Sequence, residues 1–261
     1  MAGIHSKALE AADALPGCPA PGCPAPGCPA PGFDATTGYW QRIVAAEELV
    51  QPAAPPYQRS YPARLRDGRY LLLPLRAMPG DPARCMASLV ANQAALDVVQ
   101  ALAQSMVEQA RDHAVDAVVG LPTLGLCFAP TVARGLGHAR FIPLGFSRKY
   151  WYREELSEPV RSITSPNQDK RLYLDPHQAH LLEGRRVLVV DDTVSSGATM
   201  VSSLRLLARC GAQVVVIAVA MRQGTRWRER LRDARGQPIP VLGALDAPCM
   251  VRTSAGWVPE A

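Results

Sequence analysis

The sequence has very little lysine and no long apolar segment. Lysine occurs only at positions 7, 149 and 170, so arginine supplies almost all of the 28 basic residues. No apolar run reaches the ~18 residues that a membrane-spanning helix needs, and the first residues show no basic-plus-apolar signal region. We therefore expect a cytoplasmic protein without a membrane span.

The cysteines do not form a recognisable framework. There are seven, an odd number without regular disulfide spacing, which favours a reducing compartment. Three of them lie in a Pro-Gly-Cys-Pro-Ala unit repeated in tandem over residues 16–30, and this spacing without partner ligands is not a zinc pattern. So much proline and glycine prevents helix and sheet, so we expect a disordered tail at 1–35 and a folded domain at 36–261.

Residues 186–200 are the most informative segment of the chain. Apolar, mostly β-branched residues at 187–190 predict a buried parallel strand, and Asp191 and Asp192 follow where that strand is expected to end. A Ser-Ser-Gly turn then leads into a helix near Thr199, whose free backbone N–H groups can bind phosphate. Carboxylates beside such a phosphate site suit a ligand that carries hydroxyls, metal and phosphate together, as a phosphorylated ribose does.

This segment resembles the phosphoribosyl-diphosphate (PRPP) signature of the type I phosphoribosyltransferases. The resemblance implies that Asp191 and Asp192 hold the ribose hydroxyls, directly or through Mg²⁺. It also implies that the following loop binds the 5′-phosphate through Ser195, Ser196, Gly197, Ala198 and Thr199. Ser196 stands where the family usually has threonine, which keeps the hydroxyl. The alternative is a buried strand, a polar turn and a capped helix in another α/β protein; receiver domains also pair acids at strand ends but lack the Ser-Gly-x-Thr continuation.

The pattern along the chain predicts an α/β fold, a mostly parallel sheet with helices on both faces and a small hood from flanking segments. Strands are expected at 69–75, 117–120, 141–144, 213–221 and 239–245. Pro74 places the first of these at a sheet edge or ends it. We expect a long helix from Asp81 to Ala114 and a basic helix over 225–235.

A second loop follows the strand at 117–120. By resemblance it is the pyrophosphate loop of the family, with Thr123, Leu124 and Gly125 against the diphosphate of PRPP. Taken alone, a strand, a glycine turn and a helix are common in α/β proteins. Pro130 requires that the next helix starts near it or has an irregular first turn.

Residues 145–171 lack a clear period and are rich in basic and aromatic side chains. In the family this region is a mobile loop that closes over PRPP, and a long irregular segment in a compact domain is often functional. The resemblance makes Arg148, Lys149, Lys170 and Arg171 candidates for contacting the diphosphate, with Lys149 and Lys170 as catalytic candidates beside the paired acids. The alternative is a solvated basic loop whose aromatics, at 150–152, pack on the body of the domain.

The acceptor is the least determined part of the prediction. The oxopurine branch of the family carries an acid two residues before the motif glycine, where this chain has Ser195, and the entry into the motif is similar to the adenine branch. Arg222 either approaches the base or is structural, and Trp257 either stacks on the base or anchors the terminus, which we favour.

The resemblance implies an enzyme that transfers the phosphoribosyl group of PRPP to a nitrogenous base, with a purine favoured, and releases pyrophosphate. Mg²⁺ is its expected cofactor, nucleotide salvage its expected role, and a homodimer is common in the family. The alternatives are a non-catalytic PRPP sensor and transfer to a non-purine acceptor. The net charge of +5 is mild, and without a groove-reading fold it argues against nucleic acid as a partner.

Overall fold

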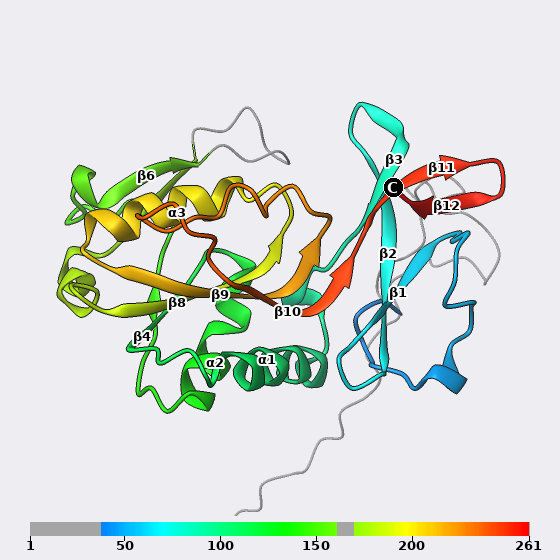
Figure 1. The fold of residues 1–261 in the computed structure, drawn as a ribbon, viewed down its shortest axis with the longest axis horizontal. Helices are drawn as coiled ribbons and strands as arrows, with labels where there is room; N and C mark the ends of the chain where they lie inside the picture. Colours follow the sequence, from blue (N-terminus) through cyan, green and yellow to red (C-terminus); the bar gives the residue numbers. More distant parts are fainter. Residues whose placement is uncertain (1–37, 161–169, 261) are drawn as a thin grey trace, which may run out of the picture. The chain divides into compact units, whose positions relative to one another are not determined.

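The computed structural model describes residues 38–160 and 170–260 (Figure 1). The predicted tail at 1–35 and the middle of the predicted mobile loop lie outside the described residues. Everything below concerns the unit that begins at Thr36.

The centre of this unit is a parallel sheet. Its strands are β4 (Ala117–Gly120), β5 (Ile142–Pro143), β8 (Arg186–Val194), β9 (Gln213–Gln223) and β10 (Val241–Ala247). They are arranged in the order β10-β9-β8-β4-β5, and every neighbouring pair is parallel. β8 therefore lies in the middle, which explains why its apolar residues at 187–190 are completely buried.

Helices cover both faces of the parallel sheet. Figure 1 shows α1 (Leu96–Ala110) and α2 (Ala129–Gly135) on one face and α3 (Ala198–Arg209) on the other. An apolar core lies on each face of the sheet, and alternate residues of β8 point into one or the other. Leu188 and Val190 pack with α1 and α2, whereas Val187 and Val189 pack with α3. The predicted α/β architecture is confirmed.

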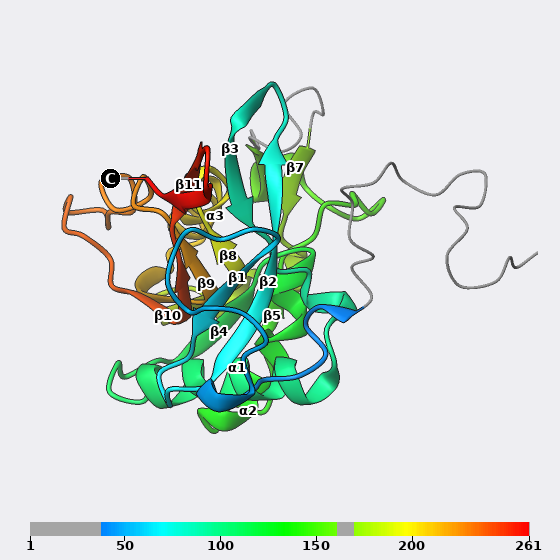
Figure 2. The same ribbon diagram turned by 90° about the vertical axis from the view of Figure 1, so that its right-hand side faces the viewer.

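An antiparallel sheet forms the predicted hood (Figure 2). It contains β1 (Ser60–Arg64), β2 (Tyr70–Met78), β3 (Asp81–Ala87), β11 (Cys249–Thr253) and β12 (Gly256–Pro259), in that order across the sheet. β3 pairs with β11, so segments from before and after the parallel sheet join in one sheet. The hood is therefore built by both flanking segments.

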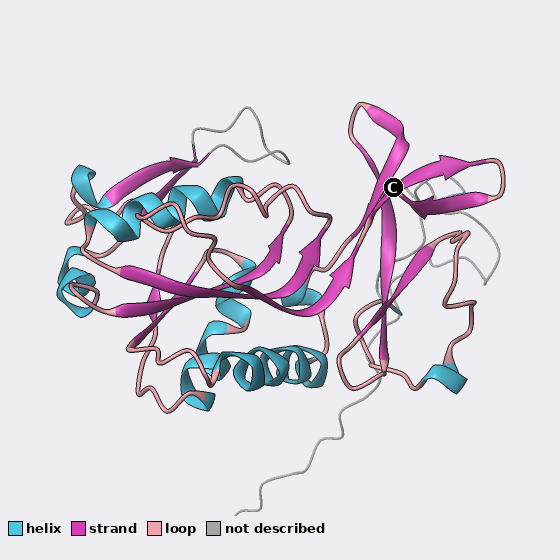
Figure 3. Ribbon diagram, viewed as in Figure 1, coloured by secondary structure: helices cyan, strands magenta, loops and turns pink. Residues whose placement is uncertain are grey.

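Shorter elements complete the unit (Figure 3). The hairpin of β6 (Ser157–Val160) and β7 (Lys170–Tyr173) packs on α3, where Arg209 donates to Glu158 at 2.6 Å. The short 3₁₀ helices are Ala46–Glu48, Ala91–Gln93, Leu124–Cys127, Glu154–Leu156 and Pro176–Leu181. α2 begins at Ala129, so Pro130 lies in its first turn, where no backbone N–H is required.

The predicted helix from Asp81 to Ala114 is wrong in its first half. Residues 81–87 form β3, and α1 begins only at Leu96, whose side chain is 85% exposed. The Asp81 carboxylate accepts a hydrogen bond from the Ala83 N–H, which holds the β2–β3 turn instead of capping a helix. Cys85 and Ala87 are buried while their neighbours are partly exposed, which is the period of a strand.

Two further expectations are corrected. Residues 225–235 form turns, not a basic helix, and the Asp233 carboxylate accepts hydrogen bonds from the Arg235 and Gln237 N–H groups, which fixes a turn at the end of this segment. β2 also continues past Pro74 and lies between β1 and β3. Pro74 is tolerated because it falls where pairing with β1 ends and pairing with β3 begins, so its missing N–H breaks no ladder.

Candidate active site

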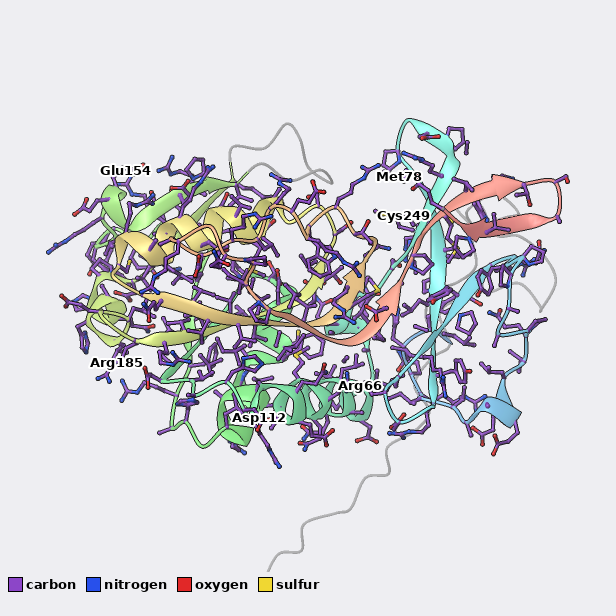
Figure 4. All side chains as sticks on the ribbon, viewed as in Figure 1. Arg66, Met78, Asp112, Glu154, Arg185 and Cys249 are labelled. Atoms are coloured by element: carbon purple, nitrogen blue, oxygen red, sulfur yellow. The ribbon has the colours of Figure 1, made fainter. Side chains whose placement is uncertain are left out.

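A cavity of about 480 Å³ opens at the carboxyl ends of the parallel strands. One part of its wall comes from the loops after β4 and β8 and from the start of α3. The other part comes from the hood, from Phe146, Val160 and Lys170, and from Gln223, Gly224 and Arg226 at the end of β9 and just after it. Figure 4 labels Met78 and Cys249 on the hood side of this cavity. Ligands of α/β sheets bind at this end of the strands.

Asp191 and Asp192 are the acidic centre of the cavity wall. Asp191 is 7% exposed, and its Oδ1 accepts a hydrogen bond of 2.9 Å from the Asp192 N–H. Burial raises the pKa of Asp191 well above its ordinary value, and the charge of Asp192 raises it further. Burial also raises the pKa of Asp192. Neither carboxylate has an ion pair among the described residues, so this pair suits hydroxyl donors or a cation.

The two acids lie on the strand, not after it. β8 pairs with β9 as far as Val194, opposite Arg222, so the expected strand end at 190 is too early. This pairing fixes the backbone of the acids against β9, whereas the pairing of β8 with β4 ends at Val190. The result is a rigid position for the carboxylates at the edge of the cavity.

The loop after β8 turns directly into α3. Gly197 adopts a left-handed conformation with φ +75°, which favours glycine, and the Ser196 Oγ accepts from the Ala198 N–H at 3.3 Å. Residues 195–199 all line the cavity, as the resemblance implies for a phosphate site. The N–H groups that follow Ala198 in the first turn of the helix have no partner within the helix and are available to an anion.

The turn at 225–231 supports this loop from behind. The Arg230 guanidinium donates to the Ser196 carbonyl at 2.8 Å, and a side chain at Gly197 would lie 3.3 Å from the Cβ of Trp227. Sequence analysis missed this support because it assigned the segment to a helix. Arg230 and Arg232 bind backbone carbonyls, Arg228 lies over the Trp227 ring, and Arg226 lines the cavity, so these arginines do not form a helical charge stripe.

Removing the Arg230 side chain is expected to loosen the loop without unfolding the domain. We expect Arg230→Ala to raise the KM for PRPP about two- to tenfold, since one hydrogen bond to the Ser196 carbonyl is lost. Steady-state kinetics with variable PRPP measures this. Arg235→Ala is the matched control, because this arginine is exposed in the same turn region and does not line the cavity. Equal KM values for the two variants would contradict the supporting role.

The loop after β4 approaches the acids closely. Thr123 and Leu124 line the cavity, and the peptide bond between Pro122 and Thr123 is cis. Gly125 is buried and does not line the cavity: a Cβ there would lie 2.8 Å from the Asp191 Cα and 2.9 Å from its Oδ1. The structure thus places Thr123 and Leu124 at the cavity and gives Gly125 a packing role against the acid.

Of the predicted basic residues, the structure brings Lys170 to the cavity. Its ammonium lies 5.7 Å from the centre of the Phe146 ring, which also lines the wall. Arg148 and Lys149 are exposed and do not line the cavity. Arg148 approaches Glu154 at 3.5 Å, and Arg171 pairs with the same carboxylate at 2.7 Å. Figure 4 shows Glu154 at the end of the sheet away from Met78 and Cys249.

Two residues with alternative interpretations are structural. Arg222 donates to both carboxylate oxygens of Asp246 at 2.7 Å, which joins β9 to β10. Trp257 is buried in the hood, pairs with Tyr57 through backbone bonds, and does not line the cavity. The anchor interpretation of Trp257 is therefore correct.

The comparison with known families agrees with this geometry. The family model described as "Phosphoribosyl transferase domain" matches residues 86–240, which is more than half of the chain. The chain belongs to the phosphoribosyltransferase family. It is accordingly an enzyme of the phosphoribosyltransferase type.

Relatives of known name are adenine phosphoribosyltransferases. The enzyme of a Nocardioides species is 32% identical over 147 residues, covering 56% of this chain and 76% of the relative. Adenine phosphoribosyltransferase 3 of Arabidopsis thaliana is 32% identical over 137 residues, covering 52% and 69%. The crystal structure of adenine phosphoribosyltransferase from Rhodothermus marinus shares the fold, with TM-score 0.50, 22% identity, and coverage of 66% of this chain and 93% of that one.

The match to this phosphoribosyltransferase family does not extend over most of the hood. It begins at Met86, within β3, and ends at Pro240, before β10. The parallel sheet up to β9 and both cavity loops are inside the matched range, whereas β1, β2, β11 and β12 are outside it. Arg84, Cys249 and Glu260, which line the cavity from the hood, were missed by sequence analysis. No local pattern marks them, because they meet only through pairing between distant strands.

Proposed function

We propose that this enzyme transfers the 5-phosphoribosyl group of PRPP to a nitrogen of a purine base and releases pyrophosphate. The observation that carries the proposal is the cavity in which Asp191 and Asp192, without basic partners among the described residues, adjoin the loop at 195–199. Unpaired carboxylates suit ribose hydroxyls, and free helix N–H groups suit the 5′-phosphate. One ligand that carries both groups explains why acids and a phosphate site share a wall.

The residues fit Mg²⁺ as a partner of the substrate, not as a separately held ion. Among the described residues no group of three or more metal-ligating side chains is arranged around one point. Asp191 and Asp192 supply oxygen atoms, and Mg²⁺ commonly takes one or two carboxylates together with substrate phosphates and water. When bound, Mg²⁺ supplies positive charge to the diphosphate leaving group.

The remaining roles follow from position and charge. Thr123, Leu124 and Lys170 line the same cavity. In this proposal the first two contact the diphosphate and the Lys170 ammonium adds positive charge beside it. In the reaction the bond from C1′ to the diphosphate oxygen breaks, its electron pair leaves with pyrophosphate, a bond from C1′ to the base nitrogen forms, and the proton of that nitrogen passes to solvent. The protein contributes orientation and charge stabilisation and requires no covalent nucleophile.

Adenine is the purine that we propose first. Ser195 replaces the acid of the oxopurine branch, and the named relatives are adenine phosphoribosyltransferases. We also propose nucleotide salvage in the cytoplasm: Cys85, Cys127, Cys210 and Cys249 are free thiols, as a reducing compartment favours. In the described part of the chain, no helix is long and apolar enough to span a membrane.

The deciding experiment measures pyrophosphate release from PRPP with a panel of purine and pyrimidine bases. We expect release with adenine in the presence of Mg²⁺ and little release with pyrimidines. Release with a pyrimidine alone would replace the purine assignment by a different acceptor. Tight PRPP binding by calorimetry without release with any base would favour a PRPP sensor.

Metal removal gives a separate prediction. We expect chelation by EDTA to reduce pyrophosphate release to background, because Asp191 and Asp192 then face the negatively charged diphosphate without a cation between them. Excess Mg²⁺ is expected to restore the full rate, measured with the same release assay. Undiminished turnover in EDTA would contradict the proposed part played by Mg²⁺.

A further inference from the structure

The hood contributes a chemically mixed wall to the cavity. Two methionines, Met78 and Met86, provide apolar and polarizable surface on which a flat heteroaromatic ring packs well. Beside them the wall contains Arg84, Cys249 and Glu260. The strand period of β3 explains part of this arrangement, since Cys85 and Ala87 are buried while Arg84 and Met86 line the cavity.

Glu260 is held at this wall by backbone and side-chain contacts. Its N–H donates to the Cys249 carbonyl at 2.8 Å, which continues the pairing of β11 with β12. Its Oε1 forms an ion pair with the Arg84 guanidinium, and both side chains are about one-third exposed, 36% for Arg84 and 32% for Glu260. Its Oε2 has no hydrogen bond or ion pair among residues 38–160 and 170–260. The carboxylate therefore has one acceptor oxygen, Oε2, that no described residue occupies.

The charge of Glu260 restricts what part of the substrates it contacts. The phosphate and diphosphate of PRPP are anionic and would be repelled by a carboxylate. The base is the neutral partner in the reaction, and its N–H groups are hydrogen-bond donors. An ionised carboxylate only accepts hydrogen bonds, and bonds to a charged acceptor are about twice as strong as neutral ones.

We infer that the free oxygen of Glu260 accepts a hydrogen bond from an exocyclic amino group of the base, and that Arg84 positions this carboxylate. This inference rests on the proposed function. It assigns the selection of an amino-bearing purine such as adenine to a particular residue, which lies outside the range matched by the family model. Gln223 also lines the wall. Its Nε2 donates a hydrogen bond of 2.9 Å to the Ala87 carbonyl, which holds this amide in place.

The test compares two nucleotides that differ in the amino group alone. AMP carries it, and purine riboside 5′-monophosphate lacks it. By titration calorimetry we expect the wild-type protein to bind AMP about ten- to a hundredfold more tightly, the effect of one hydrogen bond to a charged group. Glu260→Ala is expected to remove this preference by weakening AMP alone. Glu260→Gln keeps an acceptor oxygen and is expected to retain part of the preference.

Asp81→Asn is the matched control. Asp81 is also an acid of the hood, lies 4.0 Å from the Arg84 guanidinium, and does not line the cavity. We expect this variant to keep the wild-type preference for AMP. Thermal unfolding of all variants confirms that they are folded.

The remaining outcomes separate this inference from the proposed function. No preference in the wild type, an unchanged preference in Glu260→Ala, or equal weakening of both nucleotides would overturn the inference. If the wild type releases no pyrophosphate from PRPP and adenine, the proposed function fails. A preference for AMP that depends on Glu260 would then still support the assignment of this residue.

Discussion

Asp191→Asn is expected to lower kcat/KM for PRPP by about a hundred- to a thousandfold and to raise the melting temperature of the ligand-free protein. Activity falls because a carboxylate that faces the ribose and its cation becomes neutral, a loss comparable to removing one strong transition-state contact. The fold is retained because the asparagine carbonyl still accepts from the Asp192 N–H, as Oδ1 does at 2.9 Å. Steady-state pyrophosphate release and calorimetry in EDTA measure the two effects.

The gain in stability follows from the cost of the buried acids. Burial raises the pKa of Asp191 in the folded protein, and the charge of Asp192 raises it further. Between the ordinary aspartate value and the raised one, the ligand-free folded state binds more protons than the unfolded state, so stability decreases as the pH rises through that range. At neutral pH the variant escapes this cost, and each kilocalorie gained raises the melting temperature by about 2–4 °C in a domain of this size. The difference should shrink as the pH falls towards 4.

Asp116→Asn is the control for this pair of effects. Asp116 lies at the opposite end of the parallel sheet, is exposed, and accepts a hydrogen bond of 2.8 Å from the Arg186 N–H at the start of β8. The same chemical change there is expected to leave turnover unaltered. Near-normal turnover in Asp191→Asn would refute the role of this acid. A melting temperature below that of the wild type would contradict the view that the buried carboxylate destabilises the ligand-free protein.

The contrast between the two walls of the cavity shows what sequence can predict. The loop at 195–199 was predictable because a strand, two acids, a glycine and a helix are consecutive, so local chemistry identifies the site. Arg84 and Glu260 are 176 residues apart in the sequence and meet because β3 pairs with β11 and β11 with β12. No periodicity within one segment contains that information.

The two segments whose secondary structure was predicted wrongly have a similar physical explanation. Residues 81–87 contain an Asp-Pro pair that also starts helices, and pairing with β2 and β11 decides the outcome in favour of a strand. The arginines at 225–235 suggested a charged helix, whereas Arg230 and Arg232 bind backbone carbonyls of loops. In both segments tertiary contacts override local preference.

Gly125→Ala is expected to reduce kcat/KM by at least about a hundredfold in a protein that still folds. The new Cβ would lie 2.8 Å from the Asp191 Cα and 2.9 Å from both its Oδ1 and the Val190 carbonyl, closer than real Cβ contacts allow. The backbone of β8 is held here, because Val190 pairs with Gly120 of β4 and Asp191 pairs with Val219 of β9. The adjustment must therefore displace the Asp191 side chain or the loop with Thr123 and Leu124, and a shift of about 1 Å in a reacting group costs about a hundredfold.

Gly38→Ala and Gly120→Ala are the two controls for Gly125→Ala. A Cβ at Gly38 meets nothing within 4 Å, so that variant is expected to match the wild type in both turnover and stability. A Cβ at Gly120 would lie 2.7 Å from the Ala129 Cβ in the apolar core, so its main effect is expected on the melting temperature. Gly125→Ala differs from both because its nearest atoms belong to a functional acid and its backbone. Normal kinetics in Gly125→Ala would mean that Asp191 need not be held in place, and the proposed geometry of the ribose site would then be wrong.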